Sequence, residues 1–162
     1  MDTKTKKLID KIESENSIKE LNLKYDLEVI PYARPRKGKY GAFYNPRQKY
    51  KKDLVKLFSN DFDSSIFPIK GEVSLSFVFG INPPLDIKNS KSKMSLIIEN
   101  ILHPITRPDT DNYIKPILDA LNGILYEDDG QVYKISATKK YTTDKPYLKI
   151  KIKFRENVIK LR

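Results

Sequence analysis

The 162-residue sequence predicts an α+β fold, in which helices pack on one face of a small mixed β-sheet. Two segments, 72–81 and 147–155, alternate apolar and polar residues as half-buried strands do. Between them, apolar residues recur at helical spacing: Ile114, Ile117, Leu118 and Leu121. The length and the 39% apolar content suit a single compact domain with a real core. We expect an N-terminal helical or flexible arm at 1–25 and the folded domain at 26–162.

The N-terminal part predicts three elements. Residues 4–20 have the pattern of an amphipathic helix, although their polarity also suits a frayed arm. Residues 26–31 indicate a short strand that ends at a proline, followed by a loop at 32–46. A helix is expected from about Pro46 to Phe58, with four residues turned inward: Tyr50, Leu54, Leu57 and Phe58.

The central part contains one clear strand and one ambiguous region. The strand at 72–81 ends at Asn82-Pro83-Pro84. Residues 86–95 are polar and rich in lysine and serine, so we expect a mobile segment there. The apolar stretch at 94–102 is too short for its pattern to distinguish helix from strand.

The C-terminal part predicts a helix and two strands. The helix spans about 111–121 and ends at Asn122-Gly123, because glycine readily adopts the left-handed conformation at a helix end. Pro116 removes one backbone donor from this helix. Strands are expected at 131–137 and at 147–155, the second with its lysines outward. Those lysines suit either a protected solvated face or contact with nucleic acid.

The composition excludes several classes of protein. The sequence has no cysteine, which rules out disulfides and thiolate zinc sites. No apolar run approaches the roughly 20 residues of a membrane span, and no secretory signal is seen at the N-terminus. We therefore expect a cytoplasmic protein with no membrane partner.

Positive charge is segregated into two blocks. The formal net charge is +10, and residues 32–56 and 139–162 carry most of the excess. A basic surface suits a polyanion, although a solvated lysine-rich surface is the simpler interpretation. The predicted DNA-binding residues are Arg34, Arg36, Lys37, Lys39, Arg47, Lys49, Lys51 and Lys52. The interleaved aromatic residues suit either base stacking or packing: Tyr32, Tyr40, Phe43 and Tyr44.

Negative charge gathers between these blocks, with Lys115 as the one base at 109–129. The acids are Asp109, Asp111, Asp119, Glu127, Asp128 and Asp129. Clustered carboxylates repel one another unless a cation lies among them, so this segment predicts a site for a hard divalent ion. A metal site in a basic protein suits phosphate chemistry and predicts a metal-dependent nuclease.

Simpler roles exist for each acid. Asp109 and Asp111 suit capping of a helix, Asp111 and Asp119 suit a surface ladder with Lys115, and Asp128 and Asp129 suit a turn. A calcium loop of the EF-hand type is excluded, because Tyr113 and Ile114 stand where it needs a ligand and a glycine. Asp129 meets Asp109 only if residues 122–128 run back along the helix, which spans roughly 16 Å.

Three blocks of this sequence resemble the RusA family of Holliday junction resolvases. They are Arg-Pro-Asp-Thr-Asp-Asn-Tyr-Ile-Lys at 107–115, Asp-Ala-Leu-Asn-Gly at 119–123 and Asp-Asp-Gly-Gln-Val at 128–132. A lysine and an aromatic residue follow at 139–141, and the resemblance covers roughly residues 27–155. The sequence departs from the family pattern at Pro116, at Gly130 and in its N-terminal arm.

The resemblance implies a RusA-like fold, a bacterial or bacteriophage origin and four catalytic residues: Asp109, Asp111, Lys115 and Asp129. It implies metal binding by Asp109, Asp111 and Asp129, with Asp128 and Asp119 in support. The implied cofactor is Mg²⁺, with Mn²⁺ as a substitute. The implied activity is paired cleavage of four-way DNA junctions by a homodimer, in recombination and repair.

Two other functions remain open. A DNA-binding module without catalysis would use the acids for caps and turns alone. The other alternative is a metal nuclease that acts on flaps, replication forks or RNA. His103 precedes the acidic segment and suits a structural role, a DNA contact or an outer base.

Overall fold

The computed structural model describes residues 6, 7, 10, 17–34, 36–37, 43–44 and 47–155, with 36–37 and 43–44 described by their backbone alone. Four strands form one mixed sheet in the order β1-β6-β4-β5. They are β1 (Lys19–Tyr25), β4 (Val73–Ile81), β5 (Val132–Tyr141) and β6 (Tyr147–Phe154). Strand β6 is antiparallel to β1 and β4, whereas β4 and β5 run parallel. The short strands β2 (Arg36–Lys37) and β3 (Phe43–Tyr44) form a separate ribbon.

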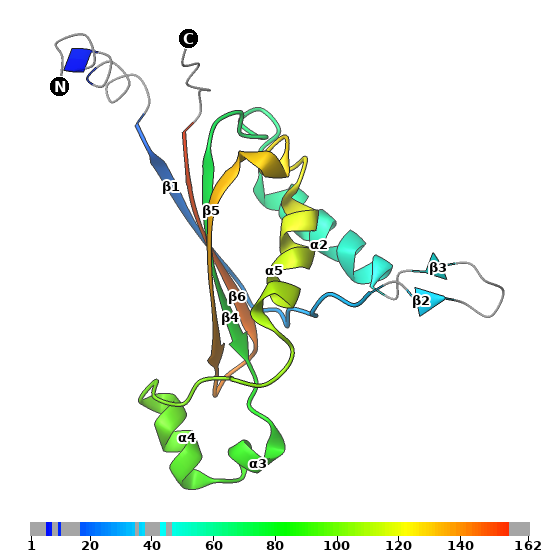
Figure 1. Cartoon of the computed structure of the whole chain (residues 1–162), viewed down its shortest axis with the longest axis vertical. Coiled ribbons are helices and arrows are strands. Elements are labelled where there is room, and N and C mark those ends of the chain that lie inside the picture. The colour runs from blue at the N-terminus through cyan, green and yellow to red at the C-terminus, as the bar shows by residue number, and fades with distance from the viewer. Residues whose placement is uncertain are drawn as a thin grey trace.

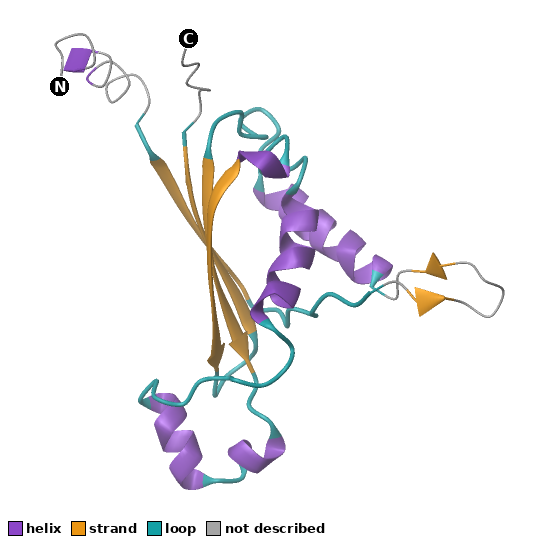
Figure 2. Cartoon of the chain, in the orientation of Figure 1, coloured by secondary structure: helices purple, strands orange, loops and turns teal. Residues whose placement is uncertain are grey.

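Two helices cover one face of the sheet, α2 (Gln48–Asp61) and α5 (Thr110–Leu121), as Figure 2 shows. Two shorter helices, α3 (Leu85–Lys88) and α4 (Lys91–Ile98), project beyond one end of the sheet (Figure 1). A single 3₁₀ turn, η1 (Asp129–Gln131), leads into β5. The predicted α+β architecture, with helices on one face of a small mixed sheet, is confirmed.

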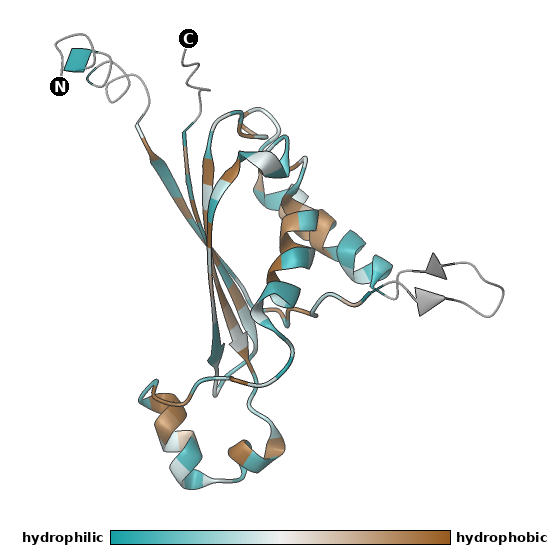
Figure 3. Ribbon diagram, in the orientation of Figure 1, coloured by the Kyte–Doolittle hydropathy of each residue, from teal (hydrophilic) through white to brown (hydrophobic). Residues whose placement is uncertain are grey.

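The core lies between the sheet and the two long helices. Strand β6 alternates strictly, so that its four apolar residues are buried: Leu148, Ile150, Ile152 and Phe154. Phe77 and Phe79 of the central strand β4 stack with ring centroids 5.9 Å apart. Leu54 and Phe58 of α2 and Ile117 and Leu121 of α5 close the core. Figure 3 shows apolar residues concentrated where α2 and α5 meet.

Most of the strongly periodic elements are confirmed. The structure contains the helix expected near 46–58, the strand at 72–81, the helix at 111–121 and the strand at 147–155. The strand expected at 131–137 continues to Tyr141. None of the helices in the described residues has both the length and the apolar character needed to span a bilayer.

One predicted strand is wrong, and two further segments form structure that the sequence did not predict. Residues 26–31 form no strand; the strand lies one segment earlier, where Leu21, Leu23 and Tyr25 turn toward the core. Strand β1 pairs along its whole length with β6, so residues 19–25, which the sequence placed in the N-terminal arm, belong to the sheet. The expected mobile segment at 86–95 contains α3 and the start of α4, whose first turn is capped by the Ser90 hydroxyl.

Candidate functional site

Two carboxylates stand at the start of α5. Asp109 is the N-cap residue, with φ −68° and ψ 153°, yet its side chain makes no capping hydrogen bond. Asp111 lies in the first helical turn, and both residues are exposed. Within the described part of the chain, neither carboxylate has a hydrogen-bonding or ion-pair partner. The positive end of the helix dipole stabilises both charges without occupying their oxygens, so both are available to a ligand.

A lysine on β5 fixes the loop that carries Asp109. The Lys139 ammonium donates to the carbonyl oxygens of Thr106, at 3.1 Å, and Pro108, at 2.8 Å. These two bonds join the sheet to the backbone immediately before Asp109. The sequence indicated Lys139 only as part of a motif, because a contact between residues 31 positions apart has no local signal.

Pro116 creates a docking point for the N-terminal segment. A residue with an N–H at 116 would donate to the carbonyl of Asn112, four positions earlier, but proline has no such donor. The Asn112 carbonyl instead accepts a hydrogen bond from the backbone N–H of Tyr32, at 2.7 Å. The Lys115 ammonium lies 4.5 Å from the centroid of the Tyr32 ring, a cation–π contact. Tyr32 is therefore anchored to α5 beside Lys115.

The opposite end of α5 carries a second acidic group. The Asp128 carboxylate accepts a hydrogen bond from the backbone N–H of Gly130, at 2.7 Å. In return, the Gln131 side-chain oxygen accepts a hydrogen bond from the backbone N–H of Asp128, at 2.9 Å. The Gln131 amide also donates to the carbonyls of Ile69 and Gly71. This reciprocal capping gives Asp128 a structural role in η1, as the turn interpretation predicted.

Asp119 and Asp129 both lie near the buried Tyr126. The Tyr126 hydroxyl donates to the carbonyl of Leu118, at 3.1 Å. Burial raises the pKa of this phenol, and the charges of Asp129 and Asp119 raise it further. These two carboxylates therefore share one neighbourhood at the C-terminal end of α5.

The acids thus form two separate groups in one chain. The 12 residues of α5 span about 18 Å between them. The expected return of residues 122–128 along the helix does not occur. The N–H of Leu125 donates to Leu121, and the carbonyl of Leu125 accepts from Ile69, so the chain turns toward the sheet instead. In Figure 1, η1 lies beside the C-terminal end of α5. Among the described residues, no group of three or more acids or histidines is placed to hold a metal.

The pair at the start of α5 nevertheless suits magnesium. Mg²⁺ usually binds one or two carboxylates, keeps several waters and takes its remaining ligands from substrate phosphates. Asp109 and Asp111 provide two unpaired oxygen donors close together in sequence. An ion held by this pair needs no third carboxylate from the same chain.

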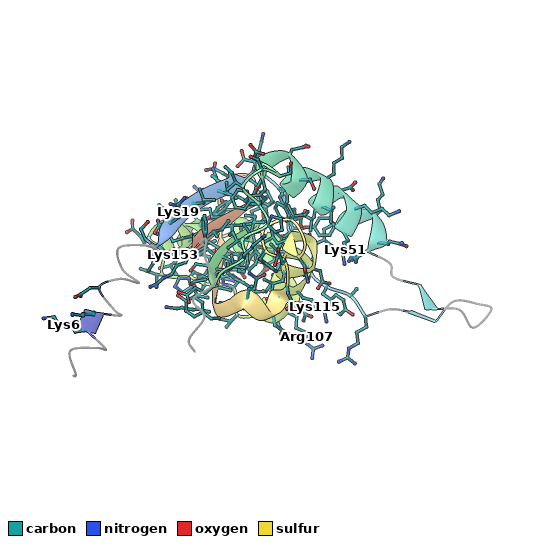
Figure 4. The ribbon with its side chains drawn as sticks, turned by 90° about the horizontal axis from the view of Figure 1, so that it is seen from above. Lys6, Lys19, Lys51, Arg107, Lys115 and Lys153 are labelled. Carbon is teal, nitrogen blue, oxygen red and sulfur yellow. The ribbon has the colours of Figure 1, made fainter. Side chains whose placement is uncertain are left out.

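Basic side chains surround this end of the molecule. Arg34 is exposed beside the docked segment, and four more bases are exposed in the first turns of α2: Arg47, Lys49, Lys51 and Lys52. In the view of Figure 4, Lys115 and Arg107 both point to the side of the molecule that carries α5. His103 is exposed in the preceding loop. The side chains of Arg36, Lys37, Lys39, Tyr40, Phe43 and Tyr44 lie outside the described residues.

Comparison with known proteins gives two matches. The family model described as "Endodeoxyribonuclease RusA" matches residues 26–153 of the chain. An uncharacterised protein of Bacillus subtilis (strain 168), YqaN, is 32% identical over 130 residues, which cover 78% of this chain and 90% of YqaN.

Proposed function

Because this chain belongs to the RusA family of endodeoxyribonucleases, we propose that it is a structure-specific nuclease that resolves four-way DNA junctions. The observation that carries the proposal is the unpaired Asp109–Asp111 couple, which follows the loop held by Lys139 and lies on the same helix as Lys115. In the paired cleavage that we propose, each active site cuts one of two opposed strands. This reaction belongs to recombination and repair.

In this proposal Asp109 and Asp111 hold Mg²⁺, or Mn²⁺ in its place, against the phosphate that is cut. When bound, the ion supplies an acidified water and neutralises charge that develops on the phosphate. Lys115 contributes a compact positive charge for the phosphate or the leaving oxygen. The ammonium itself lies over the Tyr32 ring, which favours one position for this charge. The exposed bases of α2 and Arg34 bind the DNA backbone.

We further propose that the enzyme acts as a homodimer, since cutting two strands requires two active sites. The separation of the acids in one chain supports this assembly. A twofold axis that sets two α5 helices antiparallel brings the start of one helix to the end of the other. Asp129 of one protomer then approaches Asp109 and Asp111 of its partner, which would complete the predicted three-carboxylate set.

Cleavage assays with Asp109→Asn and Asp111→Asn test the proposed site. We expect each variant to bind a labelled four-way junction normally without added metal, and to lose at least roughly a hundredfold in cleavage rate with Mg²⁺. Asp86→Asn is the matched control, because it removes the same charge from an exposed position on α3. Full cleavage by either site variant would remove that residue from the mechanism, and the same assay on Asp129→Asn tests the contribution of the distant acid.

Substrate choice separates the remaining alternatives. The wild-type protein is given four-way junctions, flaps, forks, linear duplex and RNA at equal concentration, with Mg²⁺ or with a chelator. We expect junctions to be cut fastest and only in the presence of metal. Faster cutting of flaps, forks or RNA would identify that nucleic acid, rather than the four-way junction, as the substrate. Binding without any cutting would favour a non-catalytic DNA-binding module.

A further inference from the structure

The second face of the sheet carries a lysine array. In the described part of the chain, no helix covers the face opposite α2 and α5 (Figure 2). Strand alternation and register place six lysines on this face: Lys24, Lys134, Lys140, Lys149, Lys151 and Lys153. Glu20 is the one acid at the outward positions of these four strands, which carry a net charge of +5. Asp26, directly after β1, forms an ion pair with Lys24 at 3.4 Å. We call this surface the lysine face.

Short side chains form the centre of the lysine face. Strand β4 turns Ser74, Ser76, Val78 and Gly80 to this face, between the lysine-bearing strands β6 and β5. Ser76 is partly exposed, whereas Ser74 is buried and the Tyr147 ring covers Gly80. Ser74 lies directly between Lys153 and Lys134 in the register. The Ser76 hydroxyl accepts a hydrogen bond from the Ser136 hydroxyl, at 2.8 Å. Serine hydroxyls are common partners of DNA phosphates, and the partly exposed Ser76 hydroxyl lies among the lysines.

The spacing of the lysines is regular. Three of them lie at alternate positions of β6, which separates their Cα atoms by roughly 6.7 Å. The rows on β6 and β5 lie about 10 Å apart, on either side of β4. Phosphates distributed along a nucleic-acid backbone therefore meet several ammonium groups at once.

The lysines differ in how they are held. Lys134 and Lys140 make no hydrogen bond or ion pair with the described residues. Glu20 holds Lys151 at 3.0 Å and Lys153 at 3.4 Å, and both side chains stay about half exposed. A hydrogen bond from Asn22, together with these lysines, lowers the pKa of Glu20 to about 2, so Glu20 stays ionised at neutral pH. The Tyr147 ring lies directly over Gly80, with Lys149 and Lys24 at 5.4 and 5.8 Å from its centroid.

Charge complementarity selects the partner. A second copy of this face would be repelled, because both surfaces carry +5. Residues 1–17 contain four lysines and four acids, so this segment has no net charge to match the face. A lipid surface is disfavoured, since few large apolar or aromatic side chains of these strands lie near the lysines: Val78, Tyr133 and Tyr147. A polyanion without apolar anchors remains the best match.

We propose that the lysine face is a second DNA-binding surface, which holds the phosphates of a different arm from the one cut at α5. Figure 4 shows Lys153 on the sheet side of the molecule, away from Lys115 and Lys51 on the helix side. A strand bound at α5 does not reach this face, whereas a branched substrate offers additional arms. The proposal takes its choice of polyanion from the proposed function, but binding at this face does not require cleavage.

Binding assays on a triple variant test the lysine face. Lys134→Gln, Lys140→Gln and Lys149→Gln remove three charges without breaking an ion pair to a carboxylate. With a chelator present, we expect a labelled four-way junction to bind at least roughly tenfold more weakly at moderate salt. The slope of log K against log salt should fall by about 2 to 3, because each lost phosphate contact lowers it by about 0.9.

Two further triple variants serve as controls for this binding assay. The control Lys70→Gln, Lys88→Gln and Lys91→Gln removes the same charge from exposed positions outside the face, and it should keep the wild-type slope. Replacing the three face lysines by arginine should preserve binding, which distinguishes charge from a folding defect. Equal slopes for the face triple, the control and the wild type would overturn the proposal. Loss of binding to phosphatidylserine vesicles with DNA binding intact would also overturn it.

These assays separate the two proposals. If the protein cuts no DNA but the face triple loses binding, the proposed nuclease function fails and the lysine face stands. If cleavage depends on Asp109 and Asp111 while the face triple binds and cuts as the wild type does, the lysine face fails alone.

Discussion

At the residue scale, Lys139 shows how a single side chain positions a functional loop. Its ammonium bonds two backbone carbonyls immediately before Asp109. Residues 105–109 of this loop are exposed, and Ile105 is 93% exposed. Lys139 is therefore a positioning residue, and the geometry of the acidic pair depends on it.

We expect Lys139→Met to lower the cleavage rate roughly tenfold to a hundredfold, because small displacements of reacting groups are costly. Junction binding without metal should stay unchanged, and the free energy of unfolding should fall by only about 1 kcal/mol. Single-turnover cleavage and chemical denaturation measure the two effects. Lys145→Met, in the exposed turn before β6, is the control. Undiminished cleavage by Lys139→Met would show that the loop keeps its position without this lysine.

The sequence predicted the local features of single residues better than their contacts. The positions of Asp109 and Asp111 at the start of a helix followed from the apolar pattern after them. The left-handed conformation of Gly123, with φ 78°, also followed from its place after the helix. The contacts of Lys139 and Gln131 join residues far apart in sequence, so no local pattern specified them.

At the element scale, helix α5 lacks one internal backbone hydrogen bond, because Pro116 lies inside it. Pro116 is buried within this helix and has no N–H to donate to the Asn112 carbonyl. That carbonyl accepts a hydrogen bond from the N–H of Tyr32 instead. The sequence suggested that this proline would disturb the helix. The structure shows that the unfilled acceptor instead joins a second segment of the chain to α5.

Pro116→Ala should weaken the contact between residue 32 and α5. Alanine restores an N–H that competes with Tyr32 for the Asn112 carbonyl. We expect faster amide hydrogen exchange in residues 26–34, measured by mass spectrometry, with α5 itself unchanged or better protected. Pro84→Ala, at the exposed N-cap of α3, is a control that alters the same residue type elsewhere. Unchanged exchange at 26–34 would mean that other contacts hold this segment.

Elements with long, regular patterns were predictable, and short ones were not. Strand β6 and helix α5 follow their periods over at least eight residues. Helices α3 and α4 are short and rich in lysine and serine, so capping by Ser90 stabilises structure that the apolar pattern does not reveal. Strand β1 was missed because its alternation is brief and lies beside a segment with a helical pattern.

At the scale of the whole molecule, the central strand β4 joins both halves of the sheet to the helices. Phe77 is 1% exposed and packs within the cluster that unites β4, β6, α2 and α5. A change at this position should therefore affect the entire fold cooperatively, rather than one element.

We expect Phe77→Ala to lower the free energy of unfolding by about 3–5 kcal/mol, since it removes a buried ring and leaves a cavity. Urea denaturation followed by circular dichroism measures the loss. Ile105→Ala should change stability by less than about 0.5 kcal/mol, because that side chain is exposed. A loss below about 1 kcal/mol for Phe77→Ala would indicate that the core rearranges around the missing ring.

The separation of the acids is also a property of the whole molecule. The sequence predicted that 109–129 contains a metal site, but the path of residues 122–128 depends on where the sheet lies. Leu125 and Tyr126 are fully buried and bridge toward Ile69, so packing against the core determines the path. Patterning along a helix carries no information about that choice.

The pairing of β1 with β6 has a consequence for the chain as it leaves the ribosome. β6, which comes last in chain order among the described strands, pairs with both β1 and β4. A nascent chain that has not yet produced residues 147–154 therefore carries two strands without their shared partner. Nuclease activity would consequently be withheld from incomplete translation products, and such products would present unpaired strand edges that invite aggregation or recognition by chaperones.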